Sequence, residues 1–305
     1  MKKANLVVYE HAQVDKMLHP VNVWFLPFRW GTNTYRGCEH NCVYCNARHT
    51  HEYLGLGTQE FSLKIIVKDN AAEALDKEFS RPNWNKLKTV NLSTVTDPYQ
   101  PAESKFKITR SVLEVFLKHH NALLLTTKSD LVLRDLDLLA EIGKTGFLNV
   151  VITLPTVNEG LRKKIEPNAP SIEARLRAIR QLHEAGIKTG VTAIPLLPHI
   201  SDDAASVENL VKAVSEAGAD YMIVDLLNFR GETRSRFMEL INTNFPELKT
   251  EYERLYQTDY CNKDYSKQVR KQATAFIEKA KLDKYELMFS YRKSNPPLKK
   301  QTRLN

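Results

Sequence analysis

The chain has 305 residues, of which 42% are hydrophobic and 26% are charged. This length fits either one barrel-sized domain or two smaller domains. No stretch approaches the roughly 18 consecutive apolar residues of a membrane span, and the first residues lack the apolar core of a secretory signal. We therefore expect a soluble, cytoplasmic protein that has no membrane partner.

The excess of 44 Lys and Arg over 36 Asp and Glu gives a net charge of +8. Such a balance is compatible with an anionic partner such as nucleic acid. The basic residues are spread along the whole chain, which favours a solvated surface over a binding patch. Charge alone leaves nucleic-acid binding as one of two open interpretations.

Short apolar or β-branched runs alternate with longer helical patterns, which is typical of repeated βα units around a parallel sheet. We predict an irregular N-terminal arm followed by six strands, at residues 31–36, 89–94, 122–127, 148–154, 189–195 and 221–226. Helices are predicted at residues 104–120, 171–185 and 267–281 from the spacing of their apolar residues. Gly186 and Gly218 each follow such a pattern and predict a helix end.

Six βα units predict an α/β fold, a partial (β/α)6 barrel of the TIM type with an α-rich C-terminal extension. An open doubly wound sheet is the alternative. We expect residues 1–230 to form the barrel with its N-terminal arm and residues 231–305 to pack on it as a helical extension. In such a barrel the functional groups lie on loops after the C-terminal ends of the strands.

Three of the four cysteines fall within eight positions, as Cys38, Cys42 and Cys45. In a reducing compartment this C-x3-C-x2-C spacing indicates a metal centre, because one tight loop can bring three thiolates together. Three cysteines leave one iron of a 4Fe-4S cluster without a protein ligand. An open iron can bind another molecule.

This loop resembles the radical S-adenosylmethionine (radical SAM) superfamily, whose motif has the same spacing and an aromatic residue, here Tyr44, before the third cysteine. The stretch 35–53 is similar to the branch that contains spore photoproduct lyase, and the resemblance continues at residues 96–101, 127–129 and 166–175. It implies a 4Fe-4S cluster on the three cysteines and S-adenosylmethionine on the open iron. Reductive cleavage would then give a 5′-deoxyadenosyl radical that takes hydrogen from a substrate.

A zinc site is the other interpretation of the cysteines. His40, His49 and His51 are close enough in sequence to complete a structural Cys3His site. A zinc-stabilised nucleic-acid-binding protein without catalysis is therefore the rival from another class. The strand pattern and the downstream motifs favour the cluster.

Polar residues at predicted strand ends are candidates to hold S-adenosylmethionine, with Tyr44 against its adenine as the resemblance implies. Lys128 could pair with the methionine carboxylate through a charge-assisted contact. The segment after the second strand lacks the glycine-rich sequence usual in the superfamily, so hydroxyls or Asp97 must replace it. The full set of candidates is Tyr44, Ser93, Thr94, Thr96, Asp97, Lys128, Thr153, Glu166 and Arg175.

The resemblance fails at one important position. Spore photoproduct lyase returns hydrogen to its product from a cysteine near the end of the second strand, and residues 93–97 contain no cysteine. This argues against thymine-dimer reversal as the activity. The remaining thiol, Cys261, is a candidate hydrogen relay, and an inert buried cysteine is the alternative.

We therefore predict an enzyme that cleaves S-adenosylmethionine and acts on an unidentified substrate, for which nucleic acid is one candidate class. A peptide or a small metabolite is the alternative substrate. The chemistry implies an electron donor such as flavodoxin or ferredoxin. The sequence leaves the oligomeric state open.

Overall fold

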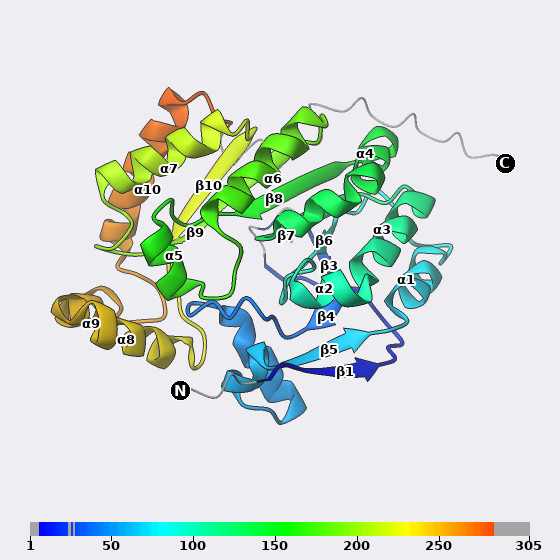
Figure 1. Ribbon diagram of the computed structural model, residues 1–305, viewed down its shortest axis with the longest axis horizontal. Coiled ribbons are helices and arrows are strands. Elements are labelled where there is room, and N and C mark those ends of the chain that lie inside the picture. Colours follow the sequence, from blue (N-terminus) through cyan, green and yellow to red (C-terminus); the bar gives the residue numbers. More distant parts are fainter. Residues whose placement is uncertain (1–5, 24–25, 27, 284–305) are drawn as a thin grey trace.

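The computed structural model describes residues 6–23, 26 and 28–283, and its centre is a seven-stranded sheet (Figure 1). The order across the sheet is β10-β9-β8-β7-β6-β3-β2. Six of these strands are parallel neighbours, and β2 (His19–Pro20) forms one edge of the sheet by pairing antiparallel with β3. The parallel strands are β3 (Trp30–Thr32), β6 (Val90–Leu92), β7 (Leu123–Thr127), β8 (Leu148–Thr153), β9 (Thr189–Leu196) and β10 (Tyr221–Leu226).

The order of the parallel strands decides between the two predicted architectures. A doubly wound sheet reverses its strand order part-way across, whereas a barrel adds each strand next to the previous one. Here the order follows the chain from β3 to β10, with only β4 and β5 diverted to a second sheet. The prediction of a partial barrel is confirmed, and the doubly wound alternative is wrong.

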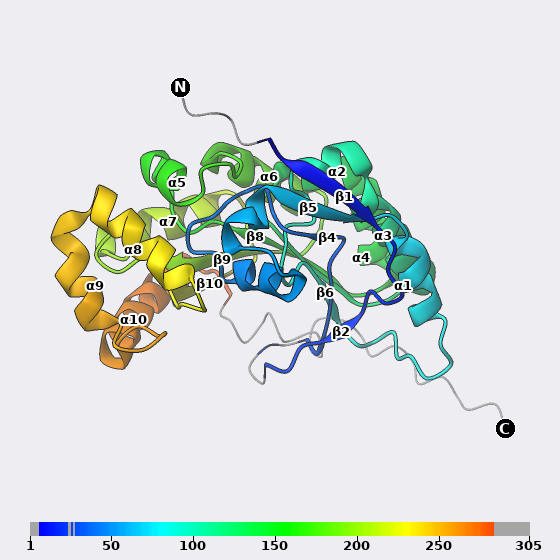
Figure 2. The same cartoon turned by 90° about the horizontal axis from the view of Figure 1, so that it is seen from below.

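Helices cover the outer face of the sheet in chain order (Figures 1 and 2). Neighbouring strand residues point to opposite faces. Leu123 and Leu125 accordingly join the large core under the helices, while Leu124 and Val151 pack on the inner face with Phe28. The covering helices are α1 (Ala71–Phe79), α3 (Ile108–His119), α4 (Leu136–Thr145), α6 (Ile172–Glu184) and α7 (Ala204–Glu216).

The N-terminal arm is not irregular, contrary to our prediction. β1 (Val8–Ala12) pairs in parallel with β5 (Lys64–Lys68), which pairs antiparallel with β4 (Tyr35–Arg36) in a separate three-stranded sheet. The predicted strand 31–36 is therefore two strands, β3 and β4. The break falls at Asn33, whose side-chain oxygen accepts hydrogen bonds from the backbone N–H groups of Thr94 and Val95. A side-chain bond to a segment 61 residues away in sequence thus takes the place of strand pairing at this point.

The predicted helix 104–120 is also divided. α2 (Pro101–Phe106) ends at Lys107, which has a left-handed backbone with φ +56°, and α3 begins at the next residue. The buried Glu103 carboxylate accepts the Thr109 backbone N–H at 2.9 Å, which stabilises the start of α3. The helix predicted at 171–185 is confirmed as α6. Gly186 and Gly218 end their helices with φ of +71° and +84°.

The extension after residue 230 is helical as far as the structure describes it. It contains α8 (Thr233–Asn244), α9 (Lys249–Leu255) and α10 (Lys263–Lys279), the last of which begins four residues earlier than predicted. α5 (Glu159–Ile165) lies between β8 and α6. Across residues 6–283, apart from 24, 25 and 27, no helix has the length and apolar character needed to cross a bilayer. The division at residue 230 stays a prediction.

Candidate active site

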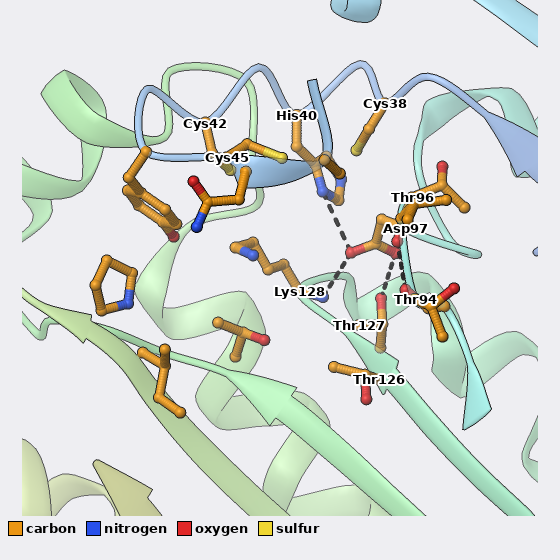
Figure 3. A pocket seen from close by; sticks show the side chains of 18 of the residues that line it. Cys38, His40, Cys42, Cys45, Thr94, Thr96, Asp97, Thr126, Thr127 and Lys128 are labelled. Carbon is orange, nitrogen blue, oxygen red and sulfur yellow. Dashed lines mark hydrogen bonds and ion pairs between the residues drawn. The ribbon is translucent and has the colours of Figure 1, made fainter. Parts of the chain in front are cut away.

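A cavity of about 320 Å³ lies at the C-terminal ends of the parallel strands. Figure 3 shows one wall formed by the loop that carries Cys38, Cys42 and Cys45, opposite residues that end β6 and β7. Cavities of this size at strand C-termini are the usual ligand sites of barrels. The remaining walls come from the ends of β8, β9 and β10.

The three cysteines face this cavity from the loop after β4. Cys38 and Cys42 are buried, and Cys45 is partly exposed. Burial raises the pKa of the Cys42 thiol to about 12, even though Lys128 opposes that shift. Burial and the nearby Asp97 carboxylate raise the pKa of Cys38 well above its usual value. Ligation to a metal centre must therefore displace protons from these thiols.

The loop is attached to the strand ends by hydrogen bonds to Gly37. Its carbonyl accepts the Thr96 hydroxyl at 2.5 Å and the Gln100 side-chain amide at 3.1 Å. Gly37 has a φ of +86°, and a β-carbon there would lie 2.7 Å from the Lys64 carbonyl oxygen. Only glycine fits this turn, because a larger residue would be both strained and too close to β5.

Asp97 is the buried anion of the site. Its carboxylate accepts the Thr127 hydroxyl at 2.6 Å and the Lys128 backbone N–H at 2.8 Å, and it lies 3.3 Å from His40 Nδ1 in the cysteine loop (Figure 3). Burial alone would raise the pKa of Asp97. The contacts from His40, Thr127 and Lys128 outweigh burial and hold that pKa at about 2. Asp97 is therefore ionised and bonded within the protein.

A second buried cluster stabilises Tyr44. The Tyr44 hydroxyl donates to Glu166, which is paired with Arg175 at 2.5 Å, and both charged side chains are fully buried. Lys128 Nζ lies 3.9 Å from Glu166 and 5.9 Å from the centre of the Tyr44 ring. Burial opposes the charge on Lys128, but Cys42 and Glu166 raise its pKa above the usual value. Lys128 thus presents a positive charge at the cavity wall.

The structure brings most of the predicted ligand-binding residues together. Glu166 and Arg175 lie behind the wall rather than in it, because they bond to each other and to Tyr44. Their role as direct ligand contacts stays a prediction. Among the candidates, the cavity is lined by Tyr44, Ser93, Thr94, Thr96, Asp97, Lys128 and Thr153.

Cys261 does not line this cavity. It lies in a second cavity of about 420 Å³, between α9 and α10. Its thiol is hydrogen-bonded to Tyr256, and the Tyr256 hydroxyl donates at 3.1 Å to the carbonyl of Leu227 in the wall of the first cavity. A relay from Cys261 stays a prediction, and it would have to pass through Tyr256.

Some residues at the site received no role from sequence reasoning. Asn46 donates to the side chain of Asn228 at 2.8 Å and so joins the cysteine loop to the loop after β10. Arg48 and Arg236 bond to the back of the cysteine loop. Arg48 lies within the motif on which the resemblance rests, so its position in the sequence could have marked it as a site residue. Arg236 and Asn228 are some 190 residues away in sequence, and no local pattern marks them.

The model of the radical SAM superfamily matches residues 32–210, which is more than half of the chain. The chain belongs to the radical SAM superfamily. It is a radical SAM enzyme, and enzymes of this superfamily use a 4Fe-4S cluster and S-adenosylmethionine and require an electron donor.

The chain is also similar to individual relatives. It is 36% identical over 264 residues to an uncharacterized protein of Mycobacterium tuberculosis, which covers 86% of this chain and 77% of that protein. An uncharacterized protein of Methanocaldococcus jannaschii is 30% identical over 233 residues, or 76% and 83% of the two chains. A spore photoproduct lyase mutant with bound AdoMet and dinucleoside spore photoproduct superposes with a TM-score of 0.64 at 15% identity, covering 90% of this chain and 79% of that one. This last match shows a shared fold.

The donor set fits the cluster that radical SAM enzymes use. A cluster takes one thiolate at each of three irons, so its cysteines need not surround a single ion. Among the described residues, no group of three or more His, Cys, Asp or Glu is placed to hold one metal ion. The cations of Lys128, Arg48 and Arg236 suit an anionic cluster of thiolates.

The low pKa of Asp97 predicts an acid-dependent loss of stability. A carboxylate whose pKa is lower in the folded protein contributes stability above its unfolded pKa, near 3.8, and this is lost as the pH falls toward 2. We expect about 2 kcal/mol of the free energy of unfolding of the metal-free protein to disappear across this window. Urea unfolding at several pH values measures it. Asp97→Asn should be less stable at pH 6 and should lose this part of the pH dependence, and equal slopes for both proteins would contradict the assignment.

Proposed function

We propose that Cys38, Cys42 and Cys45 hold a 4Fe-4S cluster and that the adjoining cavity binds S-adenosylmethionine. The observation that carries this proposal is one cavity lined by three thiols on one side and by Lys128 and Thr153 on the other. When bound, the cluster supplies the electron that cleaves the sulfonium and yields a 5′-deoxyadenosyl radical. The protein's own part is to hold, orient and enclose the reactants.

The side chains have separate tasks in this proposal. The Tyr44 ring packs against adenine, and its bond to Glu166 fixes the ring plane. Lys128 pairs with the methionine carboxylate, because its Nζ is charged and faces the cavity. Thr153 offers a hydroxyl, while Ser93, Thr94, Thr96 and Asp97 form the wall near the cysteine loop. Asp97 acts mainly by holding this wall together.

We propose nucleic acid as the substrate class. The net charge of +8 supports an anionic partner, and the fold is shared with an enzyme whose structure contains a dinucleoside spore photoproduct. Residues 93–97 offer no thiol to return hydrogen, so the reaction differs from that of spore photoproduct lyase. The electron donor is a flavodoxin or a ferredoxin, and the reaction takes place in the cytoplasm.

The cysteine assignment predicts which thiols retain the cluster. Cys38→Ala, Cys42→Ala and Cys45→Ala should each lose the iron and sulfide of anaerobically reconstituted protein and form no 5′-deoxyadenosine. Cys261→Ala is the matched control and should keep both. Iron, sulfide and zinc analysis, together with chromatography of the cleavage products, tests this. Stoichiometric zinc without cleavage in the unsubstituted protein would refute the proposed function.

The role of Lys128 predicts a change in ligand affinity. Lys128→Met should weaken the binding of S-adenosylmethionine about 10- to 100-fold, because a charge-assisted hydrogen bond contributes about 1.5–3 kcal/mol. Anaerobic equilibrium dialysis of the cluster-loaded protein measures this. Lys144→Met, which removes an exposed lysine from α4, is the control and should leave the affinity unchanged. Equal affinities for the two variants would exclude the pairing.

The substrate class predicts a dependence on salt. Binding of a single-stranded oligonucleotide should weaken linearly in log–log form as salt rises, with a slope of about −0.7 for each phosphate contact. Fluorescence anisotropy between about 50 and 200 mM salt measures the slope. If the protein forms 5′-deoxyadenosine but binds no oligonucleotide at low salt, nucleic acid is excluded as the substrate class, and a peptide or a small metabolite is favoured.

A further inference from the structure

Two arginines meet on the outer side of the cysteine loop. Arg48 Nη2 donates to the side-chain oxygen of Asn41 at 2.6 Å, and Arg236 Nη2 donates to the same oxygen at 3.0 Å. Asn41 directly precedes Cys42 and has a left-handed backbone with φ +55°. One carboxamide therefore joins two guanidinium groups next to a proposed cluster ligand.

Arg48 is enclosed by the loop that it supports. Its Nε donates to the Cys42 carbonyl at 3.3 Å and its Nη1 to the Thr58 carbonyl at 3.1 Å, and the side chain is almost fully buried beside the Phe61 ring. All these partners are uncharged. In the described part of the chain, no carboxylate lies within ion-pair distance of Arg48.

Arg236 reaches the loop from α8, in the C-terminal extension. Figures 1 and 2 both show α8 beside the turn that follows the cysteines, η1 (Asn46–Leu54). Its Nη1 donates to Gln59 at 3.0 Å, and its Nε is buried without a hydrogen-bond partner among the described residues. Glu239, one turn along α8, attracts it electrostatically but forms no ion pair within the described structure.

Two partly or fully buried cations that share an uncharged acceptor are unfavourable by themselves, because burial penalises charge and like charges repel. Arg48 donates to the Cys42 carbonyl through both Nε and Nη2, and Arg236 donates to Asn41, the residue before Cys42. Neither guanidinium forms an ion pair with a carboxylate among the described residues. The negative charge that these guanidiniums can balance therefore includes that of the cysteine thiolates.

We infer that Arg48 and Arg236 form a cationic pair that compensates the charge of the cluster-bound thiolates and thereby raises the reduction potential of the cluster. This inference rests on the proposed function. One-electron reduction adds a negative charge to the cluster, and net charge is one of the factors that set such potentials. Nearby cations favour the reduced state. Both arginines are positioning residues, since neither lines the cavity.

The test is a potentiometric titration of cluster-loaded protein, monitored by electron paramagnetic resonance under anaerobic conditions. We expect Arg236→Met and Arg48→Met each to shift the reduction equilibrium at least tenfold toward the oxidised state, which is a fall of about 59 mV for a one-electron couple. Arg236→Lys and Arg48→Lys keep the charge and should stay close to the unsubstituted protein. Arg180→Met, which removes an exposed arginine from α6, is the control for a change in net charge.

Arg236 is the decisive position, because it is only partly buried and its replacement leaves the cavity wall intact. An unchanged potential in Arg236→Met with full iron content would overturn the inference. Equal iron loss in Arg236→Met and Arg236→Lys, with the potential unchanged, would do the same, since it assigns only a structural role. If the unsubstituted protein retains no cluster, the proposed function fails first, so the two failures are distinguishable.

Discussion

The site depends on one buried carboxylate, that of Asp97. Asp97 lies in the turn after β6 and contacts two segments that are distant in sequence. It accepts hydrogen bonds from Thr127 and Lys128 at the end of β7, and it lies 3.3 Å from His40 Nδ1 in the cysteine loop. A buried carboxylate is tolerated only when its oxygens are bonded, and these bonds are made only in the correctly assembled barrel. Asp97 therefore makes the position of the cysteine loop a consequence of how β6 and β7 pair.

The charged side chains around the three cysteines differ in whether they have a partner of opposite charge. Glu166 and Arg175 neutralise each other in the interior and so stabilise Tyr44 without adding net charge to the cavity. Lys128 lies 3.9 Å from the same Glu166 carboxylate, whereas Arg48 and Arg236, which bond to the cysteine loop, form no ion pair among the described residues. Such an arrangement is poor for three protonated thiols but suitable for three thiolates bound to iron. A cluster bound at these thiols, as proposed, would supply the negative charge that the surrounding cations can balance.

The parallel strands and the cysteine loop could be predicted because they depend on local patterns. Apolar runs and glycine stops are properties of adjacent residues, and the spacing of the three cysteines lies within one loop. The predictions failed where a distant side chain decided the local structure. Asn33 divides the first strand by bonding to residues after β6, and β1 forms only because β5 offers a free edge. Arg236 could not be found for the same reason, since its partner Asn41 is 195 residues away.

The four thiols of the chain lie in two different cavities. Three line the cavity, and the fourth, Cys261, lies in another cavity and contacts Tyr256. The three thiols proposed to hold the cluster are thus gathered in one cavity, whereas the described wall of that cavity contains no further thiol that could return hydrogen to a product. A hydroxyl hydrogen is held more strongly than a thiol hydrogen, so Thr94 or Thr96 cannot replace a cysteine there. Any hydrogen return from Cys261 must cross the Tyr256–Leu227 contact, and the C-terminal extension then belongs to the reaction as well as to the fold.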